Sequence, residues 1–281
     1  MFGSRLLRRS DVRTPRHDKL FSRLLTLGVS ATVFVTSTSA ALGFDARDYY
    51  PLEVGTSWRY EVETNVLVVS GVERIEGGSE QWMEDRVLGP SPFSTVGNPV
   101  YKVRTRGEIR ARDTEEGVTK ERVSHLSATK AAIRDHGVDS VEFEVPRTIL
   151  EEWPSTDPYT VRRVPIEELN TVDQLVTILQ LGSLEITWAL KSQSTGAVEV
   201  PAGKFRKSIK QVRQGSVHGE LFGRPVRVGS ATSTTWYAKG VGFVRQHRVY
   251  YIKVRTLGGQ DIVVSQTSTT RLTDYKRPSG Q

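Results

Sequence analysis

Two places in the sequence carry residue types that enzymes and metal sites use. His136 has a carboxylate on either side, at Asp135 and Asp139, and a metal bound there would need further ligands from elsewhere in the chain. Glu151 and Glu152 are paired carboxylates that could serve acid–base catalysis. Because adjacent side chains on a strand or helix point to different faces, we expect Glu151 and Glu152 to be surface charge instead. Around His136 we expect an exposed turn and no metal site.

Motifs of the common enzyme classes are absent from the sequence. It contains no Gly-x-Ser-x-Gly elbow, no His-Glu-x-x-His motif and no glycine-rich loop before a Lys-Ser/Thr pair. Gly240 and Gly242 follow an expected strand and open no helix, which excludes a dinucleotide-binding loop. We therefore predict no catalytic, cofactor-binding or metal-ligating residues, no cofactor, and a protein that is not an enzyme.

Cysteine content and charge narrow the function further. The sequence has no cysteine, which excludes disulfides, thiolate metal sites and lipidation at a lipobox cysteine. The net charge of +7 is concentrated at the N-terminus, where residues 1–41 hold seven basic and two acidic side chains. The remaining chain is nearly neutral and offers little attraction for phosphate backbones, so we expect no nucleic-acid partner.

Residues 1–41 resemble a secretion signal. A basic segment precedes an apolar core that ends in small residues around Ala40 and Ala41, the pattern that signal peptidase cleaves. The alternative is a membrane anchor, but the apolar stretch after Arg23 is short and interrupted by Ser and Thr. We expect cleavage, no stable membrane span afterwards, and a periplasmic or secreted protein. The basic segment is long, which leaves open a translation start further along the chain.

The mature sequence indicates strands joined by short turns. Residues 58–62, 141–145 and 184–190 alternate apolar and polar side chains, the period of a half-buried strand. A turn is expected at residues 76–79 and another at 258–259, and residues 115–136 fit either a helix or strands. We predict one β-rich domain over residues 42–272 and a polar tail over 273–281.

One segment has helical spacing. Pro165 suits a first turn, apolar residues recur every three or four positions over 166–179, and Gly182 follows. A lone amphipathic helix must bury its apolar stripe against the sheet. The predicted class is thus mainly β (β-rich α+β), a curved antiparallel sheet forming a half-barrel or roll with one main amphipathic helix packed on it.

Three short segments, at residues 50–60, 200–205 and 236–242, carry a resemblance. They read Tyr-Pro-Leu-x-Val-Gly-x-x-Trp-x-Tyr, Val-Pro-Ala-Gly-x-Phe and Trp-Tyr-Ala-x-Gly-Val-Gly. In this order they resemble a group of exported bacterial β-rich proteins of unknown function, some related to the half-barrel of the lipoprotein-carrier (Lol) proteins. The resemblance implies a scaffold with an apolar concavity and assigns no site residue.

The expected function follows from these features. We predict an exported, non-enzymatic protein that binds a lipid or other hydrophobic ligand, or an envelope protein. One alternative is a structural or assembly protein that associates through an exposed strand edge such as residues 101–112. Another is a hydrolase whose site is assembled from distant residues.

Overall fold

The structure is a computed structural model that describes seven stretches of the chain. These are residues 44–93, 98–111, 117–152, 159–162, 185–221, 224–255 and 259–278. All of them belong to the unit Leu42–Gln281. The statements below concern these residues.

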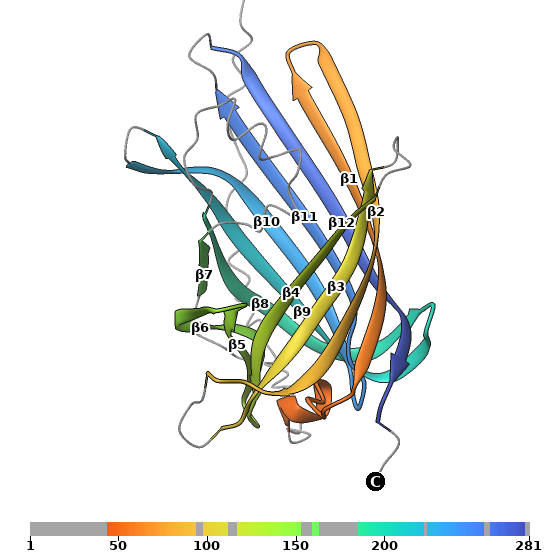
Figure 1. Ribbon diagram of the computed structural model, residues 1–281. Helices are drawn as coiled ribbons and strands as arrows, with labels where there is room; N and C mark the ends of the chain where they lie inside the picture. Colours follow the sequence, from red (N-terminus) through yellow and green to blue (C-terminus); the bar gives the residue numbers. More distant parts are fainter. Residues whose placement is uncertain are drawn as a thin grey trace, which may run out of the picture. The chain divides into compact units, whose positions relative to one another are not determined.

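Twelve strands pair in one antiparallel sheet (Figure 1). They are β1 (Ser57–Ser70), β2 (Glu73–Pro90), β3 (Val100–Ala111), β4 (Gly117–Ala128), β5 (Ala132–Val138), β6 (Val141–Glu151), β7 (Tyr159–Arg162), β8 (Glu185–Val200), β9 (Gly203–Leu221), β10 (Arg224–Ala238), β11 (Gly242–Arg255) and β12 (Asp261–Lys276). Their order is β6-β5-β4-β3-β2-β1-β12-β11-β10-β9-β8-β7. The first and last strands therefore pair at the centre, and each half of the sheet is a meander that runs outward from them.

The antiparallel sheet is confirmed, but the predicted class with a main amphipathic helix is wrong. Strand accounts for 82% of the described residues and helix for 2%, all of it in the short 3-10 helix η1 (Ala46–Tyr49). The segment expected to form the helix, residues 166–179, lies outside the described residues. Residues 117–128 and 132–138, where helix or strand was left open, form β4 and β5 because each finds ladder partners on both sides.

The three resemblance segments meet at one end of the sheet, which we call the closed end. Trp58 is 1% exposed, and its indole Nε1 donates to the carbonyl oxygen of Val241 at 2.6 Å. The Tyr60 hydroxyl donates to the carbonyl of Phe243 at 3.2 Å. Val200, from the middle segment, belongs to the same buried cluster. These residues therefore join strands from both halves of the sheet.

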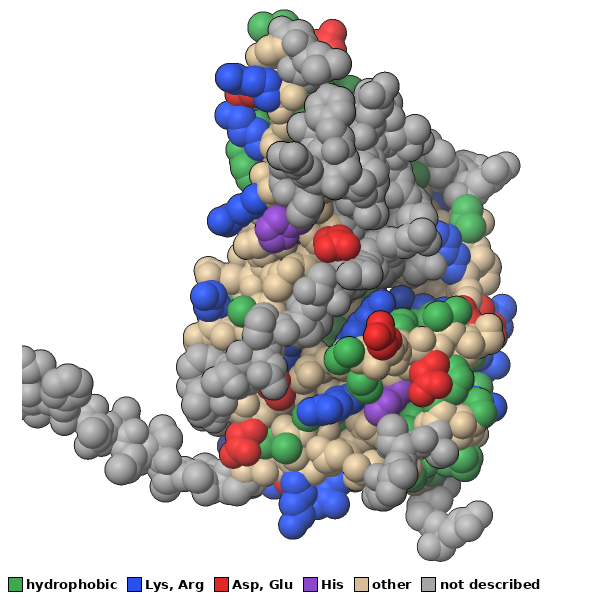
Figure 2. All heavy atoms as spheres, turned by 90° about the vertical axis from the view of Figure 1, so that its left-hand side faces the viewer, with side chains coloured by type: hydrophobic (Ala, Val, Ile, Leu, Met, Phe, Trp, Pro, Cys, Tyr) green, Lys and Arg blue, Asp and Glu red, His purple; other side chains and the backbone are tan. Residues whose placement is uncertain are grey.

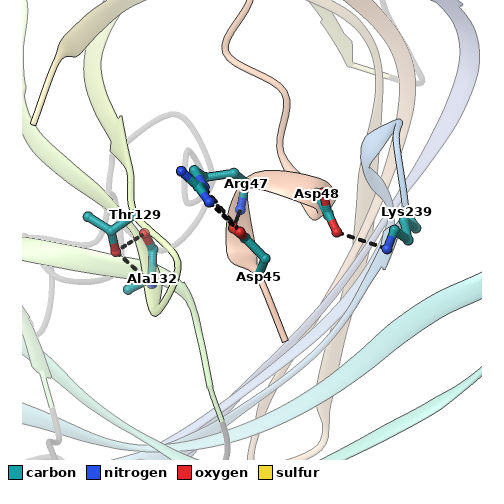
Figure 3. Close-up of polar contacts among 6 residues, drawn as sticks. All are labelled: Asp45, Arg47, Asp48, Thr129, Ala132 and Lys239. Atoms are coloured by element: carbon teal, nitrogen blue, oxygen red, sulfur yellow. Dashed lines mark hydrogen bonds and ion pairs between the residues drawn. The ribbon is translucent and has the colours of Figure 1, made fainter. Parts of the chain in front are cut away.

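Helix η1 lies across the closed end and contacts turns from both halves. The backbone N–H of Ala46 donates to the carbonyl of Lys130, in the β4–β5 turn, at 2.9 Å. On the other side, Asp48 forms an ion pair with Lys239, in the β10–β11 turn, at 2.8 Å. Figure 3 shows η1 between these two turns. The helix thereby links the two halves of the sheet.

A second tie joins edge strand β6 to β9 without a main-chain ladder. The Arg213 guanidinium donates to the backbone carbonyls of Thr148 and Ile149 at 3.3 and 3.4 Å. It also pairs with the Glu151 carboxylate at 3.2 Å. The two charged side chains are only 6% and 13% exposed. Since a buried ion pair needs its remaining donors satisfied, the carbonyls of β6 complete the site.

Two neutral side chains extend this tie. The Gln211 amide donates to the carbonyl of Glu151 at 3.0 Å, and the Tyr237 hydroxyl donates to that of Ile149 at 3.1 Å. We call Gln211, Arg213 and Tyr237, with their acceptors on β6, the β6 clasp. It holds the sheet curled by side-chain bonds where strand pairing stops.

We predict that Arg213→Met destabilises the protein by about 3–5 kcal/mol, because it leaves the Glu151 carboxylate buried without its cation. The matched control is Arg255→Met, which removes an exposed ion pair with Asp261 and should cost less than about 1 kcal/mol. Urea unfolding measures both. Equal losses for the two variants would contradict the role of the clasp.

Candidate functional site

The inner face of the curved sheet encloses a cavity of about 730 Å³. Ligand pockets in proteins span roughly 300–1,000 Å³, so the size suits a small molecule. Side chains from both halves of the sheet line it. At the closed end the lining is mostly apolar and includes Met83, Val103, Leu126, Ile149, Tyr237 and Phe243.

A second apolar cluster lines the cavity toward the other end of the strands, which we call the open end. Val66, Ile186, Trp188 and Tyr250 belong to it and face the cavity. The rings of Trp188 and Tyr250 meet edge to face, with centroids 6.4 Å apart, an arrangement that aromatic pairs favour. The two clusters are separate groups of buried residues.

Polar side chains lie between the two clusters on one wall of the cavity. In the strand register Arg213 pairs with Ser233, Ser233 with Arg248, Arg248 with Ser268, and Ser268 with Thr64. These partners share one face because cross-strand neighbours point the same way. The adjacent row holds Thr235, Gln246 and Thr270. We call these eight residues, all of which line the cavity, the polar belt.

The polar belt has hydrogen bonds of its own. The Gln246 amide donates to the Thr235 hydroxyl at 2.9 Å, and the Thr64 hydroxyl donates to Ser268 at 3.3 Å. Hydroxyls can rotate to donate or accept. The resemblance implied an apolar concavity. The concavity of this sheet is only partly apolar, because polar rows of β9–β12 and β1 face inward.

The opposite wall, on β2–β6, carries charged side chains. Lys120, Arg122 and Arg147 line the cavity there, together with Asp85 and Asp135. Asp85 accepts a hydrogen bond of 2.6 Å from the Thr105 hydroxyl, and Asp135 accepts one of 3.2 Å from the backbone N–H of Gly137. Burial raises the pKa of both carboxyls, because an ionised carboxylate loses hydration there.

The outer surface carries charged side chains of both signs. On the face shown in Figure 2, basic and acidic side chains are interspersed. The basic residues of β3 that alternate with its inward residues also lie outside: Arg106 and Arg110 are exposed, and Lys102 and Arg104 are partly so. Strand β3 therefore presents a solvated basic face on the outside of the sheet.

The candidate residues around His136 are placed apart. His136 is buried on β5, where its Nε2 lies 2.7 Å from the Ser127 hydroxyl, so the expected exposed turn is wrong. Burial lowers the pKa of this imidazole. Asp135 faces the cavity, whereas the Asp139 carboxylate accepts from the backbone N–H of Val123 at 2.9 Å. They share no site.

The paired carboxylates also diverge. Glu151 is half of the buried pair with Arg213, and Glu152 is exposed. The expectation that adjacent side chains face different ways is confirmed, but Glu151 is not surface charge. Its burial arises from the curl of the sheet, which the local sequence does not encode.

A second serine–histidine contact lies on the outer side of β4. His125 Nδ1 is 2.6 Å from the Ser91 hydroxyl, and its Nε2 lies 2.7 Å from the carbonyl of Asp139. The ring is 2% exposed and Phe93 packs on it, with centroids 4.1 Å apart. A nucleophile needs access to substrate, so this contact is structural.

No group of three or more His, Asp or Glu side chains among the described residues could hold a metal ion. None of the helices formed by these residues is long and apolar enough to span a membrane.

Comparison with known proteins gives distant structural likenesses only. No protein-family model and no curated protein matches the sequence. A candidate lipoprotein from Parabacteroides distasonis is 11% identical, with a TM-score of 0.44, over 81% of this chain and 98% of its own. A candidate exported protein with a YmcC-like fold from Bacteroides fragilis is 11% identical, with a TM-score of 0.33, over 82% and 99%.

A third solved structure is the S-type phycobiliprotein lyase CpeS from Guillardia theta. It is 10% identical, with a TM-score of 0.29, over 83% of this chain and 94% of that one. These TM-scores are all below 0.5. The three likenesses therefore carry no argument about the function of this chain.

We predict that Asp85→Asn stabilises the protein at neutral pH. Because the folded-state pKa of Asp85 is raised above its usual 3.8, the folded state binds more protons, and stability falls as pH rises through the raised value. The variant lacks this loss, so its advantage in the free energy of unfolding should grow as the pH rises from 4 to 7.

Urea unfolding at both pH values measures this difference. Glu84→Gln, on the neighbouring position of β2, controls for the change in net charge. An Asp85→Asn variant that is no more stable than wild type at pH 7 would contradict the burial of an ionisable carboxyl in the cavity.

Proposed function

We propose that the protein is an exported, non-enzymatic binding protein whose curved sheet holds an amphiphilic molecule. The observation that carries this proposal is the polar belt between two apolar clusters in one cavity of about 730 Å³. A molecule with both polar and apolar parts matches such a wall, because each part then meets groups of its own kind. Export is supported by the signal-like sequence of residues 1–41.

The strand-edge alternative has less support. The strand suggested for it, at residues 101–112, corresponds over its described residues to β3, which pairs with β2 on one side and β4 on the other. Its backbone groups are engaged in both ladders, so it offers no edge for another chain.

The test is native mass spectrometry of the protein purified without detergent from the cell fraction where it accumulates. We expect a species heavier than the polypeptide by one amphiphile, which organic extraction removes. The polypeptide mass should also correspond to a chain that begins after Ala40 or Ala41. A protein that carries no adduct and takes up no N-phenylnaphthylamine would contradict the proposal.

A blocking variant assigns the binding to the cavity. Ser268→Trp places a bulky ring in the polar belt and should abolish the adduct. Ser265→Trp places the same ring three positions earlier on β12, at a residue that does not line the cavity, and should retain it. Circular dichroism checks that both fold.

A further inference from the structure

Among the described side chains that face the cavity, basic groups outnumber acidic ones. Among the described residues that line it, five are basic: Lys120, Arg122, Arg147, Arg213 and Arg248. Two are acidic, Asp85 and Asp135. Glu151 offsets the charge of Arg213 through the clasp. Besides the Arg213–Glu151 pair, this leaves an excess of four basic groups on the described wall before Asp85 and Asp135 are counted.

The two acidic groups reduce this excess only in part. Both are held where burial favours the neutral carboxyl. Asp85 is also engaged by Thr105, whose cross-strand partner on β4 is Arg122. Cations in a cavity with low-dielectric walls act more strongly on an anion than the same charges do in water.

Arg248 is a basic residue in the middle of the polar belt. Its cross-strand partners are Ser233 and Ser268, so Arg248 lies between two serines of the polar belt and lines the cavity with them. This donor set matches a carboxylate or a phosphate, which accepts paired hydrogen bonds from arginine and single ones from hydroxyls. Tyr250, the next inward residue on β11, belongs to the apolar cluster at the open end, where an apolar chain attached to the acid could pack.

We infer that the molecule held in the cavity is an anionic amphiphile, whose acidic group is bound at the polar belt by Arg248. The inference rests on the proposed function and names its ligand class. Arg122, Arg147 and Arg248 have interactions within the protein. The inference therefore requires an excess of positive charge at the wall, and it does not require guanidinium groups without partners.

The experiment compares a charged probe, dansylaminoundecanoic acid, with its uncharged methyl ester by fluorescence titration of the mature protein. We expect the acid to bind roughly tenfold or more tightly than the ester, as for a charged hydrogen bond. Raising the salt concentration should weaken binding of the acid and leave binding of the ester unchanged, because salt screens charge.

Two variants with the same change in net charge locate the effect. Arg248→Gln should reduce the preference for the acid to about threefold or less, on the order of one lost charged contact. Arg245→Gln lies on the same strand, where the guanidinium sits over the Trp236 ring at 5.1 Å and does not line the cavity, and should leave the preference unchanged.

The outcomes separate the two proposals. Equal binding of acid and ester by wild type, with no salt effect, overturns the inference and leaves the binding function standing. A preference for the acid that survives in Arg248→Gln overturns the assignment to that residue. Binding of neither probe overturns the proposed function itself. The salt titration of wild type decides the charge question even where a variant does not fold.

Discussion

The curl of this sheet depends on the Arg213–Glu151 ion pair and the neutral bonds beside it. An antiparallel sheet of twelve strands can remain open, because each strand is satisfied by its neighbours and the two edges need not meet. Here side chains of β9 and β10 donate to backbone carbonyls of edge strand β6. That contact turns an open sheet into a wall around a cavity, and it places the basic side chains of β4 and β6 opposite the polar belt.

The closed end is fixed by a second, mainly apolar set of contacts. Trp58 and Tyr60, on the central strand β1, donate to the carbonyl of Val241 in the β10–β11 turn and to that of Phe243 in β11. Helix η1 bridges the turns on either side. Because the first and last strands pair in the middle, these contacts bring residues distant in sequence into one cluster. The three segments at residues 50–60, 200–205 and 236–242 thus serve packing, and the polar belt lies farther along the strands.

Many of the strands could be predicted from the alternation of apolar and polar residues. Which side chains point into the cavity could not be predicted in this way. Trp58 and Tyr60 alternate with charged residues and are buried. Thr64, also inward, is polar, so period two alone does not reveal its face. The turn expected at residues 76–79 is wrong: β2 runs through it, and the chain reverses at Gly71, whose φ of +60° suits glycine. β12 likewise continues through Lys276, beyond the expected start of the tail.

Binding of an anionic amphiphile against the inner face is tested most directly by quenching of tryptophan fluorescence with dibromostearic acid. Trp188 lines the cavity, whereas Trp236 does not, and lies beneath Lys210 and Arg245. We expect Trp188→Phe to remove most of the quenching and Trp236→Phe to leave it in place. Quenching that persists in Trp188→Phe and disappears in Trp236→Phe would show that the ligand binds the outer surface.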